Sequence, residues 1–177
     1  GPYNKWYGNI WLVLNWGNDG YEIKNFFDEN GDLRSVIRNE DYYFKEGITY
    51  PDTGSKGVSF RVLNNETIIG ARGPGIYNLS KKLNSNYALG FLNSKLSSYV
   101  ASSLNPTVST SISDIQKIPF VLPDKDKEQI ISVLVDNNIK IKKEINSFSI
   151  IESNYDKSPL MRFSDNTLKE RLLNYVS

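Results

Sequence analysis

The spacing of apolar residues divides the chain into a strand-like first half and a helical second half. The run IWLVLNW (10–16) is short, apolar and rich in β-branched and aromatic residues, which predicts a buried strand. Residues 21–27 fit either a short helix or a second strand. Three more β-rich pieces follow, DYYFKEGITY, GVSFRVL and TIIGARGPGIYNL, separated by the turn-forming segments PDTGSKG and NNE. The first half is therefore expected to be mainly β.

After Tyr87 the apolar period changes to that of helices. Leucines and aromatic residues recur at helical spacing up to Asn105-Pro106, which ends this predicted helix. Residues 112–120 are expected to be an irregular segment or a strand. Asp124 is placed to cap a long helix that begins near Lys125, and a short amphipathic helix is expected from Asn166 to Val176.

These elements predict an α+β fold. A mainly β body, a twisted sheet or a barrel-like structure, would be followed by a long C-terminal helix and a short terminal helix. The expected domain division lies between residues 1–123 and residues 124–177.

Composition narrows the chemistry that this fold can perform. At 177 residues, with 39% hydrophobic and 12% aromatic content, the chain is long enough to bury a core. The absence of cysteine and histidine excludes disulfides, Ser-His-Asp and Cys-His nucleophile systems and ordinary zinc sites. No apolar run approaches the roughly 20 residues that cross a bilayer, so a soluble, cytoplasmic protein with no membrane partner is expected.

The distribution of charge is more informative than its sum. The formal net charge is only +1. Basic residues gather between Lys56 and Lys95, whereas five acidic residues lie between Asp28 and Asp41. Such an asymmetry suits a polyanion bound on one side of the molecule.

Several phrases, in order along the chain, carry a resemblance to a known family. They are KWYGN (5–9), NWGNDGYEIKNF (15–26), RSVIRNEDYYFKEGITYPDTGSKGVSFRV (34–62), LGFLNSK (89–95), LNPT (104–107) and DIQKIPFVLP (114–123). Together they resemble the target recognition region of PglX-like, adenine-specific DNA methyltransferases of the bacteriophage exclusion (BREX) type. These are similar to single-chain type IIG restriction-modification enzymes, and the helix after Pro123 resembles the spacer helices of type I specificity subunits.

The resemblance implies a DNA target recognition domain at 1–123 and the start of a helical spacer at 124–177. Its implied partners are double-stranded DNA, the catalytic methyltransferase domain of the same parent chain and other subunits of the defence system. An Asn/Asp-Pro-Pro-aromatic motif and a glycine-rich loop for S-adenosylmethionine do not occur in the sequence. We therefore expect no catalytic residue, cofactor or metal in this chain, and S-adenosylmethionine as the cofactor of the parent enzyme.

Three segments offer side chains that suit DNA contacts. Arginine matches guanine edges, and lysine, hydroxyls and close-lying glycine backbone suit phosphates. The segments are the loop from Gly47 to Arg61, the glycine-rich run from Gly70 to Gly75, and the turn NPTVSTSIS (105–113). The predicted DNA-binding residues are Thr49, Thr53, Ser55, Lys56, Ser59, Arg61, Arg72, Thr107 and Ser109.

A purely structural role remains open for each segment. Arg61 alternates with apolar neighbours and fits a strand face, paired with one of the acids at 28–41. The glycine-rich run fits a bulge and turn, and the NPT segment fits a helix stop.

Two alternative functions also remain open. One is a protein-interaction module that docks a partner along residues 125–150. The other is a Mg²⁺-dependent nuclease that uses the acids at 28–41 with Glu22 and Lys24 of a Glu-x-Lys pattern.

Overall fold

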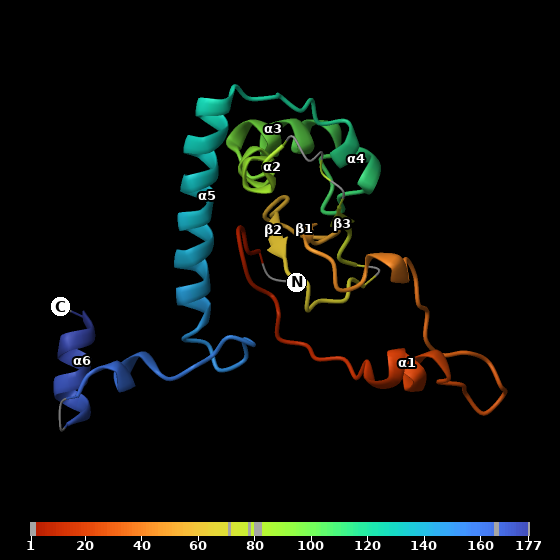
Figure 1. Cartoon of the computed structure of the whole chain (residues 1–177), viewed down its shortest axis with the longest axis horizontal. Helices are drawn as coiled ribbons and strands as arrows, with labels where there is room; N and C mark the ends of the chain where they lie inside the picture. Colours follow the sequence, from red (N-terminus) through yellow and green to blue (C-terminus); the bar gives the residue numbers. More distant parts are fainter. Residues whose placement is uncertain (1–2, 71, 78, 80–82, 165–166, 177) are drawn as a thin grey trace.

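The computed structural model describes residues 3–70, 72–77, 79, 83–164 and 167–176. About 40% of the residues are helical and 8% are extended, so the prediction of a mainly β body is wrong. The described part contains six α-helices and one small antiparallel sheet (Figure 1). The helices are α1 (Gly17–Lys24), α2 (Ser85–Leu92), α3 (Lys95–Leu104), α4 (Ile112–Gln116), α5 (Lys125–Asn146) and α6 (Leu168–Val176), with short 3₁₀ turns at Glu40–Tyr42 and Pro159–Arg162.

The three β-rich pieces yield only short strands. These are β1 (Gly47–Thr49), β2 (Arg61–Leu63) and β3 (Gly75–Ile76), in the order β2-β1-β3. Thr49 lies opposite Arg61 on one side and opposite Gly75 on the other. Pro51 follows β1 closely and Pro74 directly precedes β3, and proline does not support a long ladder. β2 ends at the turn-forming pair Asn64-Asn65. The composition thus predicted where the strands lie but not how short they are.

The apolar run at 10–16 is not a buried strand. Leu12 is 86% exposed and Val13 96% exposed, and the run has no strand pairing in the structure. Apolar composition alone does not create a strand, because pairing needs a neighbour with free backbone groups. After this run α1 begins with Asn18, Asp19 and Gly20 at positive φ, so its right-handed turn starts only at Tyr21.

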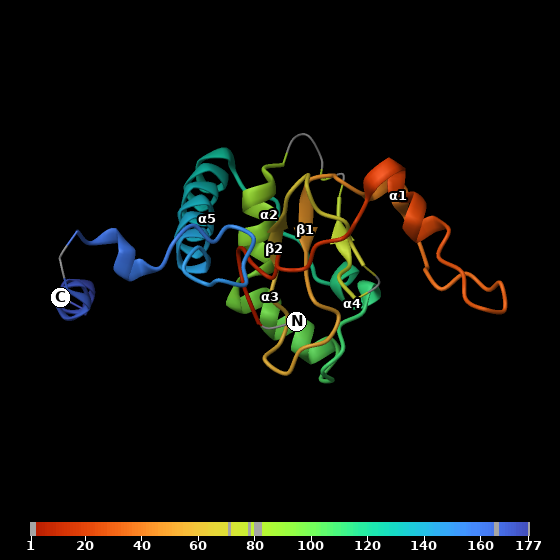
Figure 2. The ribbon, with the colours of Figure 1, turned by 90° about the horizontal axis from the view of Figure 1, so that it is seen from below.

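The hydrophobic core lies between the sheet and two helices. Its buried residues come from the N-terminal segment, from β1 and the chain around β2, and from α2 and α5: Tyr7, Ile48, Tyr50, Phe60, Ala88, Leu89, Leu92, Val135 and Ile139. Figures 1 and 2 show α5 alongside α2, on the far side of α2 from the N-terminal extension that carries α1. The core therefore crosses the expected boundary at residues 123 and 124.

The helix predicted after Tyr87 is two helices with a break at Asn93 and Ser94. The side chain of Asn93 accepts a hydrogen bond from the Phe60 N–H (3.0 Å) and donates one to the Phe60 carbonyl (2.8 Å). Ser94 caps α3 by accepting from the Ser97 N–H. The break fixes the helices to the chain beside β2, and the predicted end before Asn105 is confirmed.

Residues 112–120 contain a helix, α4, rather than a strand. Ser111 and Asp114 form a capping box at its start, which is a recognised helix-initiation signal. The predicted cap of the long helix is confirmed, because Asp124 Oδ1 accepts from the Lys127 N–H at 2.9 Å. The terminal helix is also present, with bounds Leu168–Val176, whereas the expected start at Asn166 lies outside the described residues.

Candidate nucleic-acid interface

The loop between β1 and β2 is anchored at both ends and exposed in the middle. Tyr50 and Phe60 are each 1% exposed, and their rings pack against each other at 5.3 Å between centroids. Between them, Gly57 takes a φ of +84°, which favours glycine. The buried ends hold the loop while Thr53, Ser55 and Lys56 remain exposed to solvent.

Backbone hydrogen bonds join this loop to the other two predicted segments. The Asp52 N–H donates to the Arg72 carbonyl (3.3 Å), and the Asp52 carbonyl accepts from the Thr110 N–H (2.7 Å). The Gly54 N–H donates to the Val108 carbonyl at 2.8 Å, beside an isolated bridge between Thr53 and Ser109. We call residues 52–57, 72 and 107–110 the Asp52 edge. Three segments far apart in the sequence thus form one surface.

Asp52 also organises the side chains of this edge. Its Oδ2 accepts from Arg72 Nη1 at 3.1 Å, and its Oδ1 accepts from Thr53 Oγ1 at 3.1 Å. The Arg72 side chain is 86% exposed, so solvent screens the ion pair and the guanidinium keeps donors free for a ligand. The pair orients Arg72 without burying it.

The turn from Asn105 to Ser113 is preformed by its own polar groups. Asn105 Nδ2 donates to the Ser109 carbonyl (2.9 Å) and to Asp114 Oδ2 (2.8 Å), and Asn105 Oδ1 accepts from Thr107 Oγ1 (2.7 Å). The hydrogen bond from Asn105, together with those from Ser111, lowers the pKa of Asp114. Thr107 and Ser109 are held on the exposed side of this turn.

Three of the predicted residues lie away from the exposed edge. Thr49 is 7% exposed, and its hydroxyl donates to the Pro74 carbonyl at 2.9 Å. Ser59 has no exposed surface, and its hydroxyl has no partner within the described residues. Arg61 is partly buried on β2. The structure therefore brings together Thr53, Ser55, Lys56, Arg72, Thr107 and Ser109, and separates Thr49, Ser59 and Arg61 from them.

The predicted DNA-binding residues do not include the residues whose hydrogen bonds hold the Asp52 edge together. Asp52, Asn105 and Asp114 contribute its internal hydrogen bonds. The Ser111-x-x-Asp114 spacing was a readable signal for the third of these. No local pattern marks the pairing of Asp52 with residues 72 and 110, because both partners are distant in sequence.

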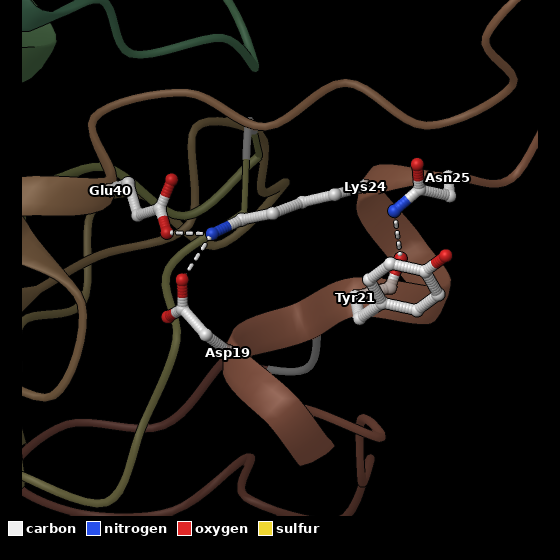
Figure 3. A network of polar contacts seen from close by, with 5 residues as sticks. All are labelled: Asp19, Tyr21, Lys24, Asn25 and Glu40. Carbon is white, nitrogen blue, oxygen red and sulfur yellow. Dashed lines mark hydrogen bonds and ion pairs between the residues drawn. The ribbon is translucent and has the colours of Figure 1, made fainter.

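The acidic segment before the sheet forms ion pairs. Figure 3 shows Lys24 between Asp19 and Glu40, with Lys24 Nζ at 2.8 and 2.5 Å from their carboxylates. The hydrogen bonds that Lys24 donates to Asp19 and Glu40 raise the pKa of Lys24, and the bond from Lys24 lowers the pKa of Asp19. Glu22 accepts from Asn15 at 2.9 Å. Within the described residues no three acidic side chains gather as a metal site would require, so no observation favours the nuclease alternative.

None of the described helices is both long enough and apolar enough to cross a membrane.

Comparison with known proteins shows distant homology to adenine-specific methyltransferases. No family model matches the chain. It is 32% identical over 121 residues to the adenine-specific methyltransferase PglX of Lacticaseibacillus casei (strain Zhang), an alignment that covers 68% of the chain and 10% of that protein. It is 28% identical over 184 positions to the adenine-specific methyltransferase BrxX of Escherichia coli O9:H4 (strain HS), covering 98% of the chain and 15% of that protein. The chain is therefore a distant homologue of a small part of these methyltransferases.

Proposed function

We propose that this chain is the DNA target recognition part of an adenine-specific DNA methyltransferase of phage-exclusion or restriction-modification defence. The observation that carries the proposal is the Asp52 edge, where three separate polar segments meet on a solvent-exposed surface. The homology to PglX and BrxX supports the same assignment. Both relatives are named as adenine-specific methyltransferases, and the chain matches only a small share of each.

The proposal places catalysis outside this chain. Neither an Asn/Asp-Pro-Pro-aromatic motif nor a glycine-rich loop for the methyl donor occurs in the sequence. Methyl transfer and S-adenosylmethionine binding then belong to another part of a longer protein. Residues 1–123 supply the recognition surface, and residues 124–177 begin a helical region that supports it.

On the Asp52 edge, Lys56 and the hydroxyls of Thr53, Ser55, Thr107 and Ser109 contact phosphates, which fixes the register of the duplex. Arg72 is the candidate base reader, because its guanidinium matches the O6 and N7 atoms of guanine. Asp52 holds Arg72 in place from one side only. Thr49, Ser59 and Arg61 stay predictions as DNA contacts. The side chains of Thr49 and Ser59 are buried, and Arg61 is partly buried.

Fluorescence anisotropy of the chain with duplex DNA, measured over a salt series, tests the proposal. Lys56→Ala removes one phosphate contact, so the slope of log affinity against log salt falls by about 0.9. Arg72→Ala weakens the preferred sequence by about 1–3 kcal/mol and reduces discrimination between sequences.

Arg34→Ala is the matched control, because Arg34 is also exposed and paired with an aspartate, Asp28, at 3.3 Å. Equal effects of Arg72→Ala and Arg34→Ala would mean that the binding depends on overall positive charge and not on the Asp52 edge. Affinity that does not depend on salt would contradict the proposal.

The protein-interaction alternative has one observation of its own. The side of α5 that faces away from the core exposes Ile130, Leu134, Ile141 and Ile145 at 62%, 57%, 56% and 53%. The spacing of this row is symmetric about residues 137 and 138. In an antiparallel pair of two copies, Ile130 would face Ile145 and Leu134 would face Ile141, as a two-fold interface requires.

Sedimentation of the chain at rising concentration tests this form of the alternative. A dimer that Leu134→Glu converts to monomer would support a self-complementary α5 row. A chain that stays monomeric at every concentration would show that a second copy does not bind the exposed row of α5.

A further inference from the structure

Within the described residues, the guanidinium of Arg61 has no partner. Its Nη1 atom is buried and makes no hydrogen bond, and the described residues supply no ion pair or hydrogen bond to its side chain. Of the acids expected to pair with it, Glu40 pairs with Lys24 and Asp28 pairs with Arg34. Among the described residues, this partly buried cation therefore has no ion-pair partner.

Arg61 lines a small cavity beside β1 and β2. The cavity measures about 140 Å³, and Gly8, Asn9, Thr49, Thr67, Gly70 and Gly73 contribute to its wall together with Arg61. No carboxylate belongs to this wall. Burial alone lowers the pKa of Arg61, with no contribution from a nearby acid.

An isolated buried charge is unfavourable. Taking an ion out of water costs several kcal/mol unless a partner and hydrogen bonds offset the loss. Arginine does not escape the cost by losing its proton, because it stays charged in proteins. The positive charge and the free N–H donors of Arg61 thus give this cavity the properties of an anion-binding site.

The shape of the cavity limits that anion to a small group. A water molecule occupies about 30 Å³ of liquid, so the space of about 140 Å³ corresponds to roughly five waters, enough for one tetrahedral or planar oxyanion. The hydroxyls of Thr49 and Thr67 are already used, by the Pro74 carbonyl and by Asn64. Gly70 and Gly73 carry no side chain that would fill the space. The planar fork of Arg61 remains as the main donor, and it matches phosphate in a bidentate fashion.

We propose that the Arg61 cavity binds a phosphate-class oxyanion. Two sources share this chemistry, free phosphate and a phosphate of a DNA backbone. The first stands without the proposed function. The second rests on it and would make Arg61 a phosphate contact of the same recognition surface.

Thermal unfolding of the chain in phosphate and in chloride, at equal ionic strength and pH, tests the proposal. The unfolding midpoint should rise with phosphate concentration and saturate, as it does for a ligand that binds only the folded state. Arg61→Met should reduce the apparent phosphate affinity at least tenfold, and Arg61→Lys should retain part of it. Arg34→Met, which removes an exposed guanidinium outside the Asp52 edge, should leave the response unchanged.

Without phosphate, Arg61→Met should unfold at the same midpoint as the unchanged chain or above it, because an unpaired charge has been removed. A clear loss of stability would show that Arg61 has a structural partner and would overturn the proposal. So would a phosphate response that is absent, or equal in Arg61→Met and Arg34→Met. If Arg61→Met fails to fold, Arg61→Lys takes its place, and a phosphate affinity equal to that of the unchanged chain would then overturn the proposal.

A competition arm identifies the source. The phosphate response is measured with and without duplex DNA, in the unchanged chain and in a variant whose DNA binding is weakened by Lys56→Ala and Arg72→Ala. If duplex abolishes the saturable response of the unchanged chain but not that of the variant, the bound group is a backbone phosphate. A phosphate response unaffected by duplex identifies a free anion. In this second case the oxyanion site stands whether or not the chain binds DNA.

Discussion

At the scale of single residues, Asn93 is the polar group on which the join between sheet and helices depends. It is 6% exposed, and its amide satisfies both the N–H and the carbonyl of Phe60. Asn93→Ala leaves the Phe60 N–H buried without a partner, whereas the Phe60 carbonyl keeps the hydrogen bond that it accepts from the Trp6 N–H at 2.9 Å. Because one such group costs about 1–3 kcal/mol, we expect the free energy of unfolding to fall by about 1–3 kcal/mol in denaturant titrations.

Asn137→Ala serves as the control for this change. Asn137 is exposed on α5, and surface substitutions usually stay within about 0.5 kcal/mol. A similar small effect of Asn93→Ala would mean that water or a rearranged chain replaces the amide.

Asp114 gives a pH-dependent prediction at the same scale. The hydrogen bond from Asn105, followed by those from Ser111, holds the pKa of Asp114 below its ordinary value. A carboxylate whose pKa is lower in the folded state stabilises the fold above its unfolded pKa of about 3.9, and the stabilisation is lost as pH falls through the folded pKa. The stability difference between the unchanged chain and Asp114→Asn should therefore shrink as pH falls below about 4.

Urea titrations at several pH values between about 2.5 and 6 measure this difference. Asp19 and Asp124 also have lowered pKa values, but both are present in the two proteins and cancel in the comparison. A difference that stays constant with pH would show that the carboxylate charge of Asp114 contributes nothing to stability.

At the scale of elements, the contact between α2 and α5 is set by a glycine. A Cβ at Gly90 would lie 2.8 Å from Cγ2 of Val135 and 3.0 Å from Cγ2 of Ile131. Gly90→Ala gains about 1 kcal/mol of helix propensity, but overpacking costs typically about 1–3 kcal/mol. Since Val135 is 3% exposed and enclosed by the core, we expect a net loss on the order of 1 kcal/mol in chemical denaturation.

A double-mutant cycle with Val135→Ala separates close approach from general damage. The added methyl group of Gly90→Ala can occupy part of the space that Val135→Ala vacates. The double variant should therefore be more stable than the sum of the single changes predicts. Additive losses would show that the two helices are not held apart by this pair.

How far elements could be predicted depended on whether their signals were local. The start of α5 followed from Asp124 and the apolar period after it, because capping and helical periodicity act within a few residues. The positions of the strands followed from composition but their lengths did not, since the pairing of β1 with β2 and β3 depends on partners 12 or more residues away. The exposed run at 10–16 had the composition of a strand and no neighbour to complete one.

At the scale of the whole molecule, the candidate interface was predicted in its parts and not in its assembly. Exposed Lys56 and Arg72 followed from loop composition. Buried Thr49 and Ser59 are chemically like their exposed neighbours, and only the packing around Tyr50 and Phe60 separates them. The union of the three segments depends on backbone hydrogen bonds to Asp52 and Gly54, for which the side-chain sequence holds no signal.

That assembly makes a prediction about the whole surface. If the Asp52 edge receives DNA, duplex binding should slow hydrogen exchange together at residues 52–57, 72–73 and 107–110, because backbone hydrogen bonds already join these segments. The α1 extension and α6 lie on opposite sides of the core in both views (Figures 1 and 2) and should exchange as before. Exchange measured by mass spectrometry, with and without duplex, provides the map. Protection confined to one of the three segments would contradict a shared surface, and protection of α5 or α6 alone would move the DNA contact to the helical side of the molecule.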